Sequence, residues 1–150
     1  MKLYVEELKA VTLVQNFTVT RRMLVERIRL HLCKYLAPTG TFTLTVKDGS
    51  GNTVATSAQT LDQMVLADAV VGSEDYYHGH VSFTFTRYPN LKPGEYTLEL
   101  SSTGYTYAEG EFIGWCKAWD DPTIALTDGD SPPPSNRAYD YEIYEVVRVR

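Results

Sequence analysis

The fold class is decided by residues 25–57, which read VERIRLHLCKYL, then APTG, then TFTLTVKD, then GSGN, then TVATS. In the first and third segments, apolar and polar side chains alternate with a period of two, which is typical of strands with one buried face. The predicted inward residues are Ile28, Leu30, Leu32, Leu36, Phe42, Leu44 and Val46. Pro38 and Gly40 turn the chain once, and Asp48 to Asn52 forms a hairpin loop. Three antiparallel strands with no helix between them follow from this pattern.

Further stretches show the same alternation. Strands are predicted within residues 11–20, around Val81, Phe83 and Phe85, around Tyr96, Leu98 and Leu100, within residues 105–117, and over residues 139–150 as the final strand. We therefore predict an all-β fold, an antiparallel two-sheet sandwich of the jelly-roll type with about eight or nine strands.

The remaining segments are less regular, but they fit one domain over residues 1–150. Residues 1–10 are predicted to form an arm or a short helical turn. Residues 60–75 fit either a helix or a strand. Residues 120–137 are acidic and rich in proline, and are predicted to be a long surface loop.

Composition and charge exclude several classes of partner. The net charge of −5 argues against a nucleic-acid partner, because phosphate binding needs a basic surface. No apolar run has transmembrane length and the N-terminus lacks the apolar core of a signal peptide, so we expect no membrane partner and synthesis in the cytoplasm. Cys33 and Cys116 match no metal-binding spacing, and the sequence leaves open whether they form a disulfide or stay free.

A set of spaced residues resembles a jelly-roll module of tailed-phage virion proteins and bacterial surface proteins, whose architecture is similar to carbohydrate-binding modules. The set runs from Gln15-x-Phe17-Thr18-Val19 through Ile28-x-Leu30-x-Leu32, Pro38-x-Gly40, Val54-Ala55-Thr56-Ser57, Val81-x-Phe83-x-Phe85 and Gly94-x-Tyr96-x-Leu98-x-Leu100 to Trp115 and Tyr139-Asp140-x-x-Ile143-Tyr144. The resemblance implies a non-catalytic structural or attachment protein of a virion: a capsid decoration, tail or fibre component. Its partners would be other virion subunits or further copies of itself in a symmetric oligomer. The alternative is a carbohydrate-binding module that recognises a surface glycan.

Aromatic side chains are the leading candidates for contact with a glycan or a protein partner. These are Tyr76, Tyr77, Tyr105, Tyr107 and Trp119, while Trp115 is expected in the core. Arg27 and Arg29 share the polar face of one strand. They are predicted either to pair with Asp140 and Glu142 across strands, or to form an assembly face against a neighbouring subunit.

No catalytic set is evident, so we expect no enzyme activity and no cofactor. His78 and His80 lie on one side of a strand and are able to hold a metal, but the sequence shows no third ligand. His31 lies on the outward row with Arg27 and Arg29, and we expect the three histidines to be exposed or locally bonded. Asp120, Asp121, Asp128 and Asp130 offer oxygens for Ca²⁺ but have no recognised spacing, so we expect a solvated acidic loop rather than a Ca²⁺ site.

Overall fold

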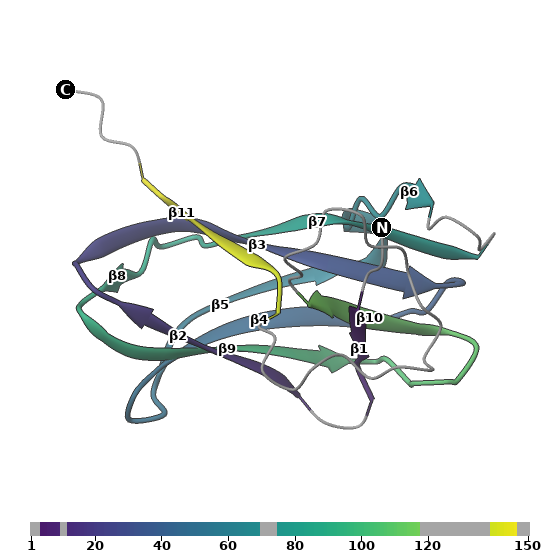
Figure 1. The fold of residues 1–150 in the computed structure, drawn as a ribbon, viewed down its shortest axis with the longest axis horizontal. Coiled ribbons are helices and arrows are strands. Elements are labelled where there is room, and N and C mark those ends of the chain that lie inside the picture. The colour runs from purple at the N-terminus through teal and green to yellow at the C-terminus, as the bar shows by residue number, and fades with distance from the viewer. Residues whose placement is uncertain (1–3, 10–11, 70–74, 118–138, 147–150) are drawn as a thin grey trace.

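The computed structural model describes residues 4–9, 12–69, 75–117 and 139–146, and in these ranges the chain is almost entirely β-strand (Figure 1). The strands are β1 (Tyr4–Glu7), β2 (Leu13–Val19), β3 (Met23–Tyr35), β4 (Thr41–Asp48), β5 (Thr53–Thr60), β6 (Asp68–Ala69), β7 (Tyr76–Thr84), β8 (Asn90–Leu91), β9 (Gly94–Thr103), β10 (Phe112–Lys117) and β11 (Tyr141–Glu145). A single 3-10 turn, Leu61–Gln63, is the one helical element of the described residues, and none of their helices is suited to crossing a membrane.

The strands form two antiparallel sheets. In the larger sheet the order is β1-β10-β3-β7-β6, with β8 and β11 also paired to β3, and the smaller sheet has the order β2-β9-β4-β5. Eight main strands are thus arranged as two quartets, β1-β10-β3-β7 and β2-β9-β4-β5, in which the chain repeatedly passes from one sheet to the other. This is the strand order of a jelly roll, so the predicted fold class is confirmed.

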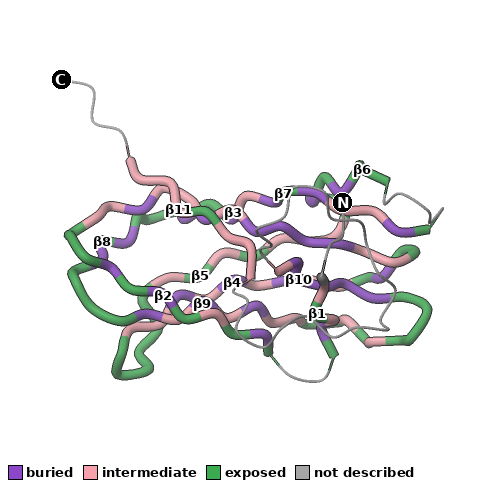
Figure 2. Tube along the Cα trace, viewed as in Figure 1, coloured by how far each residue is buried: buried purple, intermediate pink, exposed green. Residues whose placement is uncertain are grey.

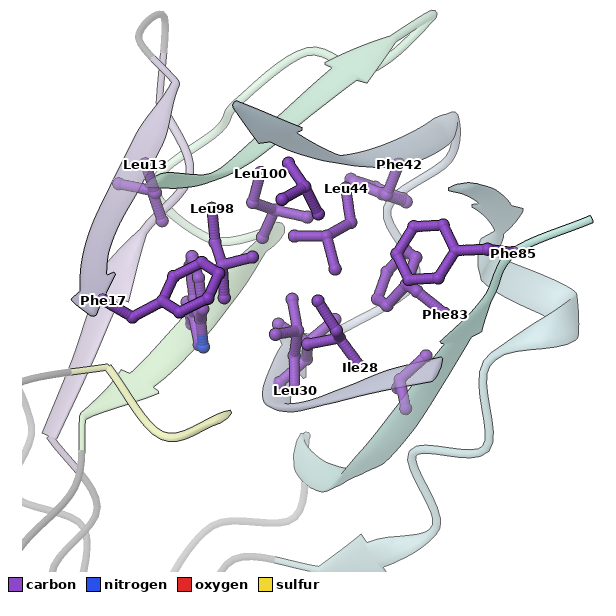
Figure 3. Packing of buried hydrophobic residues seen from close by; sticks show 14 of the residues in the cluster. Leu13, Phe17, Ile28, Leu30, Phe42, Leu44, Phe83, Phe85, Leu98 and Leu100 are labelled. Atoms are coloured by element: carbon purple, nitrogen blue, oxygen red, sulfur yellow. The ribbon is translucent and has the colours of Figure 1, made fainter. Parts of the chain in front are cut away.

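The core lies between the two sheets and is made by the inward rows that the alternation predicts. Ile28, Leu30, Phe42, Leu44 and Phe83 are fully buried, and Figure 3 shows these side chains meeting those of β2 and β9. Buried residues alternate with less buried ones along most of the strands, whereas many of the connecting turns are exposed (Figure 2). Burial of each large apolar side chain stabilises the fold by about 1.5–3 kcal/mol, which makes period-two burial the main source of stability.

One edge of β3 is shared by two strands that are far apart in sequence. β10 pairs with the end of β3 from Leu32 to Tyr35, and β11 pairs with the part from Val25 to Leu30. The two strands meet at Asp140, whose carbonyl accepts a hydrogen bond from the backbone N–H of His31 at 3.2 Å. In Figure 1, β11 (yellow) lies alongside β3. This junction places the side chain of Asp140 next to the middle of β3.

The segment after the 3-10 turn closes one end of the core. Gly79 of β7 pairs with Leu32 and faces inward, where a Cβ atom at this position would lie 2.4 Å from the carbonyl oxygen of Val65. Met64 and Leu66 of the same segment are buried. The close approach requires glycine at residue 79, because any side chain there would displace the segment.

Several predictions from the sequence were wrong in detail. The N-terminal arm is wrong for Tyr4–Glu7, which forms a strand on β10, and the described chain has eleven strands rather than eight or nine. Leu36 is 44% exposed because β3 ends at Tyr35 and Leu36 turns the chain with φ 57. The final strand is confirmed for Tyr141–Glu145. The predicted loop at residues 120–137 lies outside the described residues.

Candidate functional site

Polar side chains that are able to exchange protons or bind a ligand lie together on the outer face of the larger sheet. On β3, Arg27, Arg29 and His31 point away from the core, because Ile28 and Leu30 between them are buried. The antiparallel register sets His31 opposite His80 of β7 and Arg29 opposite Glu142 of β11. Residues directly opposite in such a ladder share a face. The centre of this face therefore combines side chains from three strands.

Three histidines and one aspartate form a cluster at this centre, which we call the histidine–aspartate cluster (His31, His78, His80 and Asp140). Nδ1 of His31 lies 3.2 Å from Oδ2 of Asp140, and Nε2 of His31 lies 2.9 Å from Nδ1 of His78. The rings of His31 and His80 stack with centroids 4.4 Å apart. Of the two alternatives predicted for His31, exposed or locally bonded, the structure shows the second: its side chain is bonded through both ring nitrogens and is 8% exposed, against 42% for His80 and 34% for Asp140.

The electrostatics of the cluster favour neutral His78 and His80 beside a charged Asp140. Burial lowers the pKa of His78 and of His80, and the neighbouring His31 lowers both further. The hydrogen bond from His31 lowers the pKa of Asp140 below its usual value, against the opposing effect of burial. With Asp140 ionised, a neutral His31 carries its proton on Nδ1 and accepts at Nε2 from His78.

The hydrogen-bonded series Asp140–His31–His78 has only part of the arrangement that nucleophilic catalysis needs. The Asp140–His31 contact matches the carboxylate and base of a catalytic triad, where the second ring nitrogen of the base faces a hydroxyl or thiol. Here His78 occupies that position. What the cluster offers is proton exchange and metal ligation: single ligand atoms of His31, His80 and Asp140 lie within 4.8 Å of one another.

The arginines that were predicted as an assembly face have partners within the chain. Arg29 forms an ion pair with Glu142 at 2.6 Å, which confirms the predicted cross-strand charge pair. Arg27 donates to the hydroxyl of Ser82 at 2.7 Å, and its guanidinium lies 4.0 Å from the ring centroid of Tyr144. Within the described part of the chain, Asp140 pairs with His31 and not with Arg27 or Arg29. A contact of the arginines with a neighbouring subunit stays a prediction.

The candidate aromatic residues are divided between the core and the surface. Tyr76 is 9% exposed and packs with Cys33 and Phe112, so it cannot offer a ring face for stacking on a glycan. Tyr105 donates to the carbonyl of Leu8 at 2.8 Å, and Tyr107 donates to the carboxylate of Glu7 at 2.7 Å.

Tyr77 is the remaining candidate among the described tyrosines. It is half-buried in β7 and packs against the core, with the ammonium of Lys34 5.7 Å from its ring centroid. Trp119 and the four aspartates considered for Ca²⁺ lie outside the described residues. Trp115 is buried as predicted, and its indole N–H donates to the carbonyl of Asp140 at 3.0 Å.

Two further features were left open by the sequence. Cys33 and Cys116 are free thiols, and both are fully buried. A groove of about 720 Å³ opens beside the turn between β3 and β4, where its lining includes Lys34, Pro38 and Asp62. The single ammonium group of Lys34 and the single carboxylate of Asp62 do not indicate a particular ligand or reaction for this groove.

The sequence pointed to His78 and His80 but not to the complete cluster. The missing step was the strand register: once Arg29 is set opposite Glu142, Asp140 falls beside His31. The known proteins give no guidance, since no protein family, no curated protein and no solved structure matches this chain. The candidate site therefore stands on its geometry alone.

Proposed function

We propose that this protein is a non-catalytic structural or attachment subunit of a phage-like particle, acting through contacts with other subunits. The jelly-roll strand order carries the proposal, because it is the fold that the resemblance to phage virion modules implies. Fold alone does not fix function. The occupied second nitrogen of His31 also favours a non-catalytic role, since no hydroxyl or thiol of the described chain takes the nucleophile position beside it.

The outer face of the smaller sheet is the best candidate for contact with other subunits. Short hydroxyl side chains are numerous on it, alongside Lys47, Glu95 and Glu99. We call it the threonine face, after Thr18, Thr41, Thr43, Thr45, Thr56, Thr97, Ser101 and Thr103. In its middle row, Thr45 lies between Thr56 of β5 and Glu99 of β9. The ion pair of Lys47 with Glu99, at 2.9 Å, is the one salt bridge found on this face among the described residues.

Such a face suits a contact between rigid subunits. Threonine is branched at Cβ and has few side-chain rotamers, so ordering it in a contact costs less entropy than ordering a lysine or glutamate. Its methyl group gains from burial while the hydroxyl is able to donate or accept a hydrogen bond. The outer face of the larger sheet is less suited, because its arginines and carboxylates already have partners within the chain.

The alternative, recognition of a surface glycan, receives less support from the described residues. Of the predicted tyrosines, Tyr76 is buried, and the hydroxyls of Tyr105 and Tyr107 are already bonded within the chain. A glycan array separates the two functions. Specific binding that is lost in Trp119→Ala would favour the alternative, and the proposal expects no such binding.

Mass spectrometry of purified particles tests the proposal. Particles released from a culture that carries the gene are banded by density, and tryptic peptides of the chain are quantified against those of the major particle protein. The proposal expects the chain at a constant ratio across the particle band. Its absence from intact particles, with the chain present in the surrounding lysate, would overturn the proposal.

A further inference from the structure

The histidine–aspartate cluster has the composition and spacing of an open metal site. Oδ2 of Asp140 lies 3.2 Å from Nδ1 of His31 and 4.0 Å from Nε2 of His80, and one ligand atom from each of the three residues lies within 4.8 Å of the others. Neighbouring ligands of a tetrahedral zinc ion are about 3.3 Å apart, given bonds of about 2.0–2.1 Å. The separation between His31 and Asp140 thus already fits. A modest movement of His80 would bring its nitrogen to a similar distance from the other two ligand atoms.

The surroundings of the cluster provide both rigidity and access. His31 is buried in the middle of β3, so the backbone and its neighbours fix its ring, whereas His80 and Asp140 are partly exposed and leave a side open to solvent. Glu142 neutralises Arg29 beside the cluster, and Asp68 of β6 lies opposite His78 in the strand register. The carboxylates of Asp140 and Asp68 therefore add negative charge at and beside the cluster, which attracts a cation.

The ligand types select the ion. Two imidazoles and one carboxylate favour a transition metal over Mg²⁺ or Ca²⁺, which prefer oxygen ligands. His78 would then act as an outer partner: its contact with Nε2 of His31 at 2.9 Å orients the ring, as carboxylates and carbonyls do for many zinc-bound histidines. We propose that His31, His80 and Asp140 bind a divalent transition-metal ion of the zinc class, with at least one coordination position left to solvent or a partner.

Binding requires two local changes. The proton on Nδ1 of His31, which now lies between that nitrogen and Asp140, must leave so that the nitrogen lone pair faces the ion. Nε2 of His31 then carries a proton and donates a hydrogen bond to Nδ1 of His78, whose own proton moves to its Nε2. The ring of His80 must also turn out of its stack on His31, since two nearly parallel rings cannot both point a nitrogen at one ion. His80 is exposed enough to turn without moving the core.

The ion would join three strands that are brought together only by the fold. His31 belongs to β3, His80 to β7, and Asp140 stands at the entry to β11. Because the three ligands are close together only in the folded chain, metal binding would stabilise it, by an amount that rises with metal concentration. The bound ion would thereby stabilise the pairing of β11 with the edge of β3.

Titration with Co²⁺ and Zn²⁺ tests the inference. Purified, tag-free chain is stripped with chelator and titrated with Co²⁺, whose visible absorption reports nitrogen and oxygen ligation, and Zn²⁺ is then added in competition. We expect one ion per chain, displacement of Co²⁺ by Zn²⁺ and a melting temperature that rises with metal. His80→Ala and Asp140→Asn should each weaken binding at least tenfold, and Glu95→Gln, on β9 of the smaller sheet and away from the cluster, should not.

Two results would overturn the inference. One is the absence of saturable 1:1 binding by the wild-type chain. The other is unchanged affinity in both His80→Ala and Asp140→Asn, which would mean an adventitious ion only. Circular dichroism of each variant verifies folding, and His80→Ala removes an exposed ring, so at least this variant should keep the β-sheet spectrum.

Discussion

Nδ1 of His31 lies 3.2 Å from Oδ2 of Asp140, although the two residues are 109 positions apart in the chain. The contact exists because β10 and β11 divide one edge of β3 between them, and Asp140 lies where the two strands meet. Since the backbone carbonyl of Asp140 also accepts from the N–H of His31 and from the indole of Trp115, the position of its side chain is well fixed. The C-terminal strand is thus connected to both the core and the histidine–aspartate cluster.

Acidification should destabilise the fold between about pH 7 and pH 5. The pKa values of His78 and His80 are lowered in the folded chain, by burial and by His31, so the unfolded chain binds more protons just below the ordinary histidine value of 6.5. Stability therefore falls as pH falls through this window. The lowered pKa values of Asp140 and Glu142 act at lower pH, below 3.8 and 4.5 respectively.

Urea unfolding at pH 7.5 and pH 5.5, with chelator present, measures this effect. A His78→Gln/His80→Gln double variant serves as the control, because it removes both titrating rings and should flatten the pH dependence. Equal or higher stability of the wild-type chain at pH 5.5 would contradict the assignment of depressed pKa values to these histidines.

Gly79→Ala should destabilise the fold by about 1–3 kcal/mol, the usual cost of overpacking a well-packed core. The added methyl group would meet the backbone of Val65, which cannot rotate away as a side chain can. Gly110→Ala is the matched control, since a Cβ atom there meets nothing within 4 Å, and its stability should stay close to that of the wild type. Denaturant midpoints that rank the two variants in the reverse order would show that the segment after the 3-10 turn does not lie on Gly79.

Both thiols should be unreactive in the folded protein. Cys33 and Cys116 are fully buried, and burial raises the pKa of Cys116 well above its usual value, so the reactive thiolate is scarce. At pH 8, a disulfide-exchange reagent should therefore label neither thiol rapidly in the native chain. In denaturant it should label both thiols. Immediate labelling of the native chain, or no free thiol after denaturation, would be inconsistent with two buried free cysteines.

Strand periodicity predicted much of this fold because the inward rows are nearly free of exceptions. Phe42, Leu44 and Val46 are all fully buried, as their alternation with threonines indicates. Periodicity failed where pairing rather than burial decides the structure: Tyr4–Glu7 has too few residues for a pattern and is a strand only because β10 lies beside it. The site was visible in parts, as a pair of histidines and as an expected pairing of β3 with the C-terminus. Its assembly depends on a strand register that composition does not encode.

The most direct test of the proposed contact role compares two threonine-to-lysine variants on opposite sheets. Thr43 lies on the threonine face between Ala58 and Ser101, and Thr84 is an exposed position on the outer face of the larger sheet. Each variant is expressed in cells that produce particles, and its peptides are quantified in purified particles. We predict that Thr43→Lys lowers incorporation at least tenfold, about 1.4 kcal/mol of contact free energy, while Thr84→Lys is incorporated like the wild type. Equal incorporation of both variants would contradict a contact through the threonine face.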